Sequence, residues 1–204
     1  MVRQEDDHDE AVLEKLDLYT LTNLLLNPKQ RIDVQRRVLS IFGGLSPSVR
    51  TDHVARVLAA MIAAPRAYHP DLMMSVIDLL ATDPEPGATG ALLDVLPQVA
   101  RSTLQGDGLS PEFREYFYQA LSTRRREGDL PIWRERLPRL DADTLVAILL
   151  DPQAKAIYSM LDPLKLIDRL PKAERRRALI TIVMRADARQ GWRALRMLLG
   201  GRAR

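Results

Sequence analysis

Apolar residues recur at helical spacing along most of the chain. Val34, Val38, Ile41, Phe42 and Leu45 follow the i, i+4, i+7, i+8, i+11 rhythm of one buried helix face, and similar stripes continue towards the C-terminus. No segment alternates apolar and polar residues as a half-buried strand does. The pattern predicts an all-α protein of about ten to twelve helices. We place them over about residues 10–27, 28–42, 47–64, 70–82, 88–105, 110–126, 129–138, 142–150, 153–161, 163–169, 171–187 and 189–199.

Three leucine-rich stretches run into Asn or Asp followed by proline, at Asn27-Pro28, Asp83-Pro84 and Asp151-Pro152. Proline disfavours the helical conformation in the residue before it, so each pair predicts the end of a helix. The same Asn or Asp can cap a new helix, with proline at its first position, where a missing N–H does no harm. Each pair therefore predicts the tight corner of a helical hairpin. Gly43-Gly44 predicts a further helix end, in the left-handed conformation that glycine adopts without steric cost.

Local composition divides the chain into four segments. Residues 1–9 have no hydrophobic period and predict a disordered acidic tail. The best linker candidate is Gln105-Gly106-Asp107-Gly108, between N-terminal hairpins over 10–105 and C-terminal hairpins over 109–200. We expect these two groups of hairpins to form one continuous domain. Residues 201–204 complete the chain as a basic tail.

The first hairpin resembles the repeats of the HEAT and armadillo proteins. The resemblance is carried by Leu25-Leu26-Asn27-Pro28, by Ile32 four residues on, and by the ending from Leu39 to Gly43, with Asp33 where the family usually has arginine. The shorter helices near 129–169 are similar to helical repeats of flagellar motor switch proteins and magnesium-transporter cytosolic domains. The first resemblance implies antiparallel hairpins stacked as an irregular, right-handed α-solenoid. Both resemblances imply a general role in binding other macromolecules.

Composition excludes several chemistries. The chain has no cysteine, which excludes disulfides, thiolate metal sites and cysteine nucleophiles. Its three histidines, His8, His53 and His69, are not at ligand spacing, and no glycine-rich phosphate loop is present. The acidic start is the opposite of a signal peptide, and no apolar run reaches the roughly 20 residues that span a bilayer. We therefore expect a cytoplasmic protein without enzymatic activity, bound metal or cofactor.

Charge is distributed unevenly along the chain. Residues 1–20 carry a net charge of −5 and residues 169–204 a net charge of +9, against +3 for the whole chain. Arginine outnumbers lysine 25 to 5, which reflects either the codon usage of a GC-rich bacterial genome or selection for bidentate contacts to phosphate or carboxylate. Arginines also cluster along the chain, two of them next to tryptophans at Trp133-Arg134 and Trp192-Arg193. The candidate contacts to phosphate or to an acidic partner are Arg124, Arg125, Arg126, Arg175, Arg176, Arg177, Arg189, Arg193 and Arg196.

These observations leave two functional hypotheses from different classes. The first is a helical-repeat scaffold or adaptor that binds a protein partner within a larger assembly. The alternative is nucleic-acid binding through the arginine-rich C-terminal hairpin, with tryptophan stacking on bases. A basic ridge could also hold the acidic N-terminus of the same or a second molecule. The competing structural interpretation makes the arginines solvated faces and places both tryptophans in the core.

Overall fold

The computed structural model describes residues 12–105, 108–158 and 160–199. These residues form helices and turns without a strand, which confirms the all-α prediction. Within the described ranges, no helix combines the length and apolar character that crossing a membrane requires. The α-helices are α2 (Leu18–Leu26), α3 (Ile32–Gly44), α4 (Pro47–Ala63), α5 (Pro70–Thr82), α6 (Pro86–Gln105), α7 (Pro111–Thr123), α8 (Leu130–Arg136), α9 (Ala142–Leu150), α10 (Pro163–Asp168), α11 (Lys172–Arg185) and α12 (Ala188–Leu198). Short 3₁₀ helices are η1 (Pro65–Ala67), η2 (Glu127–Asp129), η3 (Leu137–Arg139) and η4 (Pro152–Ile157).

The chain divides into two compact units, Met1–Leu92 and Leu93–Arg204. This division lies inside α6, whereas composition suggested a linker at residues 105–108. Glycine content marks a turn, but the packing that separates two units leaves no mark of that kind in the sequence. Residues 106–107 of the predicted linker, and the tails predicted at 1–9 and 201–204, lie outside the described residues.

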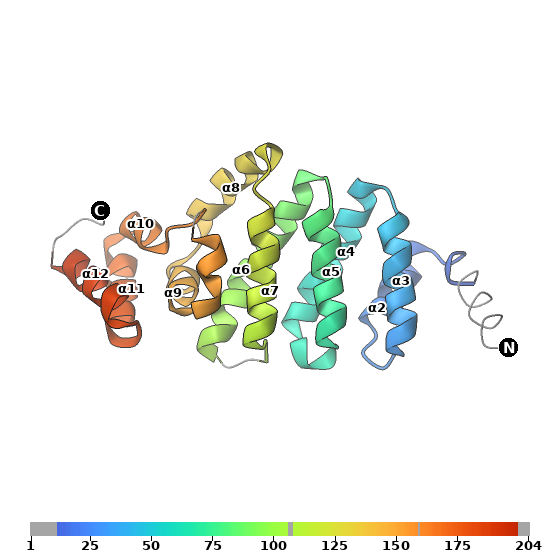
Figure 1. The fold of residues 1–204 in the computed structure, drawn as a ribbon, viewed down its shortest axis with the longest axis horizontal. Coiled ribbons are helices and arrows are strands. Elements are labelled where there is room, and N and C mark those ends of the chain that lie inside the picture. The colour runs from blue at the N-terminus through green and yellow to red at the C-terminus, as the bar shows by residue number, and fades with distance from the viewer. Residues whose placement is uncertain (1–11, 106–107, 159, 200–204) are drawn as a thin grey trace. The chain divides into compact units, whose positions relative to one another are not determined.

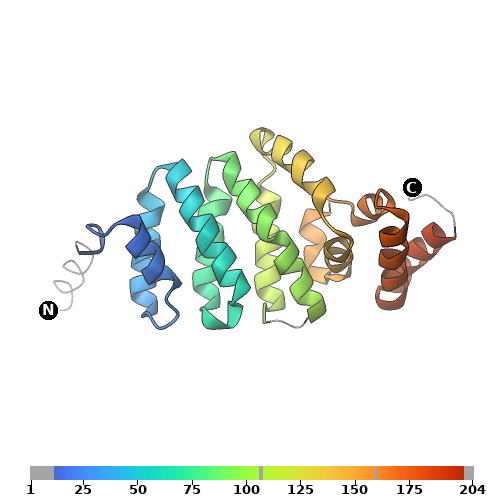
Figure 2. The ribbon, with the colours of Figure 1, turned by 180° about the vertical axis from the view of Figure 1, so that it is seen from behind.

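In the first unit, two helical hairpins pack side by side. The hairpins are α2–α3 and α4–α5, and they meet through α2 against α4 and α3 against α5 (Figures 1 and 2). The core between them consists of apolar side chains that are almost completely buried, including Leu25, Phe42, Val57, Met61 and Leu72. Burial of each such side chain contributes roughly 1.5–3 kcal/mol. Helix propensity alone would not hold helices of this length, so this shared core stabilises them.

In the second unit, α7 packs against η4, and α9 packs against α10 and α11. The last hairpin is formed by α11 and α12, which make extensive contact with each other. Gly191 of α12 faces α11 there, since a Cβ atom at this position would lie in van der Waals contact with the carbonyl oxygen of Val183, at 3.7 Å. The core of this unit includes Phe117, Leu121, Ile148, Ile157 and Leu179, all of them almost fully buried.

The three Asn/Asp-Pro corners end helices as predicted. Asn27, Asp83 and Asp151 are the C-cap residues of α2, α5 and α9. In each, a side-chain oxygen accepts a hydrogen bond from the backbone N–H two residues on, at 3.0, 2.9 and 3.1 Å. This local turn fixes the direction in which the chain leaves the helix.

The predicted second role, capping the next helix, is found only at Asp151, where Pro152 opens the 3₁₀ helix η4. It is wrong at the other two corners, because α3 begins at Ile32 and α6 at Pro86. The side-chain oxygen makes the same turn hydrogen bond at all three corners, so this bond alone does not decide whether a helix starts at the proline.

The prediction for Gly43-Gly44 is also wrong. Helix α3 runs through both glycines, and Leu45 is its C-cap in an extended conformation. The side chain of Arg50 donates a hydrogen bond from Nη1 to the Gly43 carbonyl oxygen at 2.9 Å. Because Arg50 satisfies this carbonyl at the helix end, a left-handed turn is not needed to do so.

Arg50 also ties this helix end to a corner far away in the sequence. Its Nε donates to Asp83 Oδ2 at 2.8 Å, and Thr51 Oγ1 donates to the same oxygen at 3.0 Å. The Asp83 side chain is fully buried, and the Arg50 side chain is 15% exposed. One carboxylate thus joins the start of α4 to the end of α5.

Asp83 makes stability depend on pH in the acidic range. Burial alone would raise the pKa of its carboxyl, but hydrogen bonds from Arg50, the Glu85 N–H and Thr51 hold that pKa below its ordinary value. Its stabilising contribution is therefore fully present above the unfolded-state pKa of about 4 and is lost as the pH falls through the lower folded-state value. We expect Asp83→Asn to flatten the fall in the free energy of unfolding below about pH 5, measured by urea denaturation.

The matched control is Asp52→Asn, which changes an exposed aspartate of the same unit. This variant should keep the wild-type dependence on pH. If Asp83→Asn and the wild type lose stability in parallel on acidification, Asp83 does not carry the effect.

Candidate interaction surface

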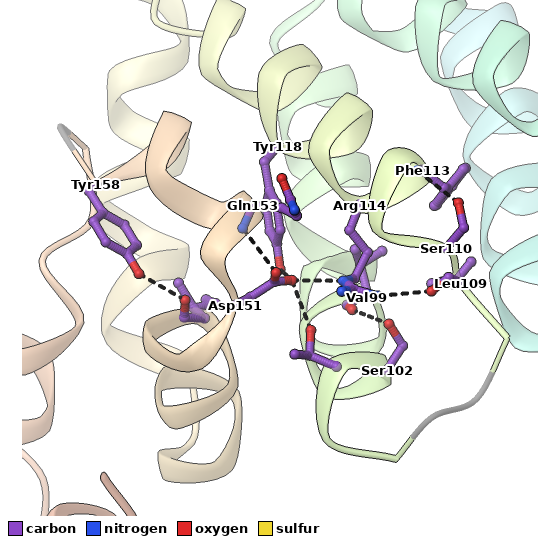
Figure 3. A network of polar contacts seen from close by, with 12 residues as sticks. Val99, Ser102, Leu109, Ser110, Phe113, Arg114, Tyr118, Asp151, Gln153 and Tyr158 are labelled. Atoms are coloured by element: carbon purple, nitrogen blue, oxygen red, sulfur yellow. Dashed lines mark hydrogen bonds and ion pairs between the residues drawn. The ribbon is translucent and has the colours of Figure 1, made fainter. Parts of the chain in front are cut away.

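A buried carboxylate, Asp151, organises the middle of the second unit (Figure 3). Its Oδ2 accepts hydrogen bonds from Arg114 Nε at 2.8 Å, Thr103 Oγ1 at 2.8 Å and Tyr118 Oη at 3.2 Å. Arg114 also donates from Nη1 to the Leu109 carbonyl oxygen at 2.8 Å. Four segments, α6, α7, the end of α9 and the start of η4, therefore meet at one buried charge.

Two tyrosines complete this network, and both remain protonated at neutral pH. Burial, followed by the neighbouring Asp151 charge, raises the pKa of Tyr118 far above its ordinary value. The same two causes raise the pKa of Tyr158 to about 12. Tyr158 donates to the carbonyl oxygens of Ile148 and Leu149, each at 3.1 Å, and so satisfies the C-terminal end of α9 (Figure 3). These phenols act as hydrogen-bond donors to the fold.

The corners at Asp83 and Asp151 share a signal that the search for motifs missed. The sequence Gly-Leu-Ser-Pro-x-x-Arg occurs twice, as Gly44–Arg50 and Gly108–Arg114. In both copies the serine and proline start a helix, and the arginine is its fourth residue. Each arginine bonds to the aspartate of a later corner, 33 and 37 residues further on. This repeated segment is the sequence signal that marks both arginines as equivalent positions of the fold.

Arg124 must be removed from the candidate contacts. Its side chain is fully buried, and Nη2 lies 3.0 Å from Asp129 Oδ1. The carbonyl oxygen of Arg124 accepts a hydrogen bond from Trp133 Nε1 at 2.7 Å, and Trp133 is itself buried. Arg124 and Trp133 therefore hold the segment after α7 to α8, and neither can reach a phosphate or a partner. A run of three arginines gives no sign that its first member is buried.

The other eight candidate arginines differ in how much of their charge is available. Arg175 is half-buried and lies 3.2 Å from Asp168 Oδ1, while Arg177 is exposed and lies 3.7 Å from Asp143 Oδ1. Among these eight arginines, the exposed side chains that make neither an ion pair nor a hydrogen bond with the described residues are those of Arg125, Arg176, Arg189, Arg193 and Arg196. Arg126 is exposed as well. Four of these five candidate arginines lie on the α11–α12 hairpin.

The same hairpin exposes large apolar side chains. On α11, Ile180 is 46% exposed and Met184 is 78% exposed. They are four residues apart, so they share the helix face opposite to the buried side chains of Ala178, Leu179 and Ile182. Arg176 and Arg177 flank this exposed stripe.

On α12, Trp192 is 61% exposed, and Leu199, the C-cap residue, is 80% exposed. Trp192 is therefore not a core residue, unlike Trp133. The arginines 189, 193 and 196 occupy the adjoining side of this helix at i, i+4, i+7 spacing. We call these exposed residues of the two helices together the hairpin face: Arg176, Arg177, Ile180 and Met184 on α11, and Arg189, Trp192, Arg193, Arg196 and the C-cap Leu199 on α12.

Comparison of the chain with protein-family models, with curated proteins and with solved structures found no match in any of the three. The resemblance to HEAT and armadillo repeats therefore stays a prediction. What the chain can bind has to be inferred from the chemistry of its own surface.

Loss of the Asp151 side chain should destabilise the protein strongly. Asp151→Ala leaves the buried Arg114 guanidinium without its counter-charge, a change that costs about 3–5 kcal/mol. The matched control is Asp33→Ala, because Asp33 pairs with Arg31 through side chains that are 44% and 81% exposed. That exposed pair is screened by solvent and contributes little to stability. Denaturant unfolding measures both, and equal losses would show that Asp151 is not a structural centre.

Proposed function

We propose that this protein is a non-enzymatic helical-hairpin scaffold that binds an acidic protein partner through the hairpin face. Of all large apolar side chains exposed in the described residues, half belong to this face: Ile180, Met184, Trp192 and Leu199. Trp, Met and Arg are enriched in protein-binding surfaces, and Trp and Arg often contribute most of the binding free energy there. This exposed apolar face carries the proposal.

The arginines define the kind of partner. Arg176, Arg189, Arg193 and Arg196 lack a counter-charge within the described residues, so a docked surface rich in Asp and Glu would supply it. The planar guanidinium fits a carboxylate through two parallel hydrogen bonds. The apolar residues would supply the buried contact area, and the arginines orientation and specificity.

The interior supports a non-enzymatic role. The buried charges of Arg50, Asp83, Arg114 and Asp151 all bond to other groups of the fold. His53, which stacks on Phe42 with ring centroids 5.9 Å apart, packs in the first unit. The packing of α2–α3 against α4–α5 also supports the solenoid-like arrangement that the HEAT resemblance implies.

A photo-crosslinker at position 192 tests the proposed surface. With p-benzoylphenylalanine in place of Trp192, we expect a discrete protein adduct in the native cell. Adding Arg196→Glu should remove that adduct, because Arg196 lies one helical turn from position 192 and a carboxylate there opposes an acidic partner. The matched control carries the crosslinker at Tyr19, which is 75% exposed on α2. An adduct of equal yield at position 19, or no protein adduct at position 192, would contradict the proposal.

A second candidate function, nucleic-acid binding, is favoured by the exposure of Trp192 beside Arg189, Arg193 and Arg196. Proteins that bind single-stranded nucleic acid stack its bases on aromatic rings and contact its phosphates through positively charged side chains. Three phosphate contacts give a slope of about −2 for log affinity against log salt concentration with a single strand.

Fluorescence anisotropy with a labelled single-stranded oligonucleotide measures this slope. If nucleic acid is the partner, we expect Arg189→Ala, Arg193→Ala and Arg196→Ala together to bring the slope close to zero. The corresponding control replaces Arg56 and Arg66, which are exposed in the first unit. Absence of binding at low salt would exclude this function and leave the protein partner.

A further inference from the structure

A groove lies on the second unit, away from the buried Asp151 network. It has a volume of about 350 Å³ and is formed by α8, the 3₁₀ helix η3, the turn before α10, and α10 with its C-cap. Three of its lining residues are the apolar Leu137, Met160 and Leu166, each of them half-buried. Leu161, which is almost fully buried, closes the floor. The groove therefore offers apolar surface that the fold itself leaves uncovered.

Three cations surround this apolar floor: Arg134 from α8, Lys165 from α10, and Arg169 at the C-cap of α10. Lys165 Nζ lies 3.8 Å from Asp162 Oδ2, which partly compensates its charge. The guanidinium groups of Arg134 and Arg169 are exposed and make no ion pair or hydrogen bond with the described residues. Asp162 is the one acidic residue that lines the groove, so its lining residues carry a net charge of +2.

We propose that this groove binds a short acidic peptide segment of a protein partner, with an apolar side chain on the floor and flanking carboxylates on Arg134 and Arg169. Charge complementarity selects the carboxylates, and the half-buried leucines and methionine select the apolar side chain. Methionine is unbranched and can adjust its shape to side chains of different form.

The open form of the groove favours a peptide over a small anion. Sites for small molecules bury most of the ligand surface in an enclosed cavity. This groove is open to solvent, so a small anion would keep much of its hydration. An extended peptide can place one side chain on the floor while neighbouring residues reach the cations at the rim. The groove is separate from the hairpin face, and its occupancy does not depend on the function proposed there.

The test uses the full chain and a fluorescein-labelled peptide in which Asp and Glu alternate with Leu. We expect saturable binding, and we expect Arg134→Glu with Arg169→Glu to weaken it about tenfold or more, since each reversal replaces an attraction by a repulsion. Arg134→Gln with Arg169→Gln should weaken it less. The matched control, Arg56→Glu with Arg66→Glu, makes the same change in net charge on the first unit and should bind like the wild type. Circular dichroism checks that each variant is folded.

Four results would overturn the proposal. An Asn/Gln version of the peptide that binds equally well would remove the role of charge, and competition by inorganic phosphate at equal concentration would identify a general anion site. Equal weakening by the groove and control variants would indicate a non-specific effect of net charge. Loss of peptide binding in Arg193→Glu with Arg196→Glu, but not in the groove variants, would place the peptide on the hairpin face and leave the protein-binding function standing.

Discussion

The fold depends on a buried carboxylate at the end of a helix, paired with an arginine that starts another helix. Asp83 and Asp151 each close a local turn with one oxygen and bind an arginine with the other. The arginine in turn bonds to a backbone carbonyl, of Gly43 or Leu109. Such a pair is costly to desolvate and is stable only when its hydrogen-bonding groups are satisfied. Only one relative placement of the helices satisfies them, so the pair fixes register where apolar packing alone would allow sliding.

At the first corner, Asn27-Pro28, an uncharged side chain joins the helices in the same way. Gln35 donates from Nε2 to the carbonyl oxygens of Leu25 and Asn27, both at 3.0 Å. Like Arg50 and Arg114, Gln35 is the fourth residue of its helix. A long polar side chain at the fourth position of a helix can reach the corner, because the first turn of that helix lies beside the end of the neighbouring helix. The position in the helix matters more than the charge that occupies it.

Helix positions were predictable because apolar spacing and proline are local signals. The spans 70–82 and 142–150 agree with α5 and α9, and each has a clear apolar run that stops at an Asp-Pro pair. The start of α3 was missed by several residues, because Arg31, a residue type that gives no capping signal, occupies its N-cap position in place of Asn27. The sequence did not predict how deeply each charged side chain is buried. Arg124 and Arg125 are adjacent and chemically identical, yet one is fully buried and the other exposed, since only the packing of η2 and α8 decides between them.

The same limit applies to the surfaces proposed for binding. Periodicity placed Arg189, Arg193 and Arg196 on one helix side, but it could not show that Trp192 lies outside the core. The groove combines residues from α8 and α10, which are separate in sequence, so no local sequence pattern predicts it. Both surfaces use guanidinium groups that the fold leaves unpaired, whereas Arg50 and Arg114 show how the same group behaves when the fold supplies a carboxylate. An acidic partner would give the exposed arginines the geometry that Asp83 and Asp151 give the buried ones. The planar guanidinium fits a carboxylate or a phosphate through two parallel hydrogen bonds, so these arginines suit a partner that carries such groups better than a diffuse negative potential.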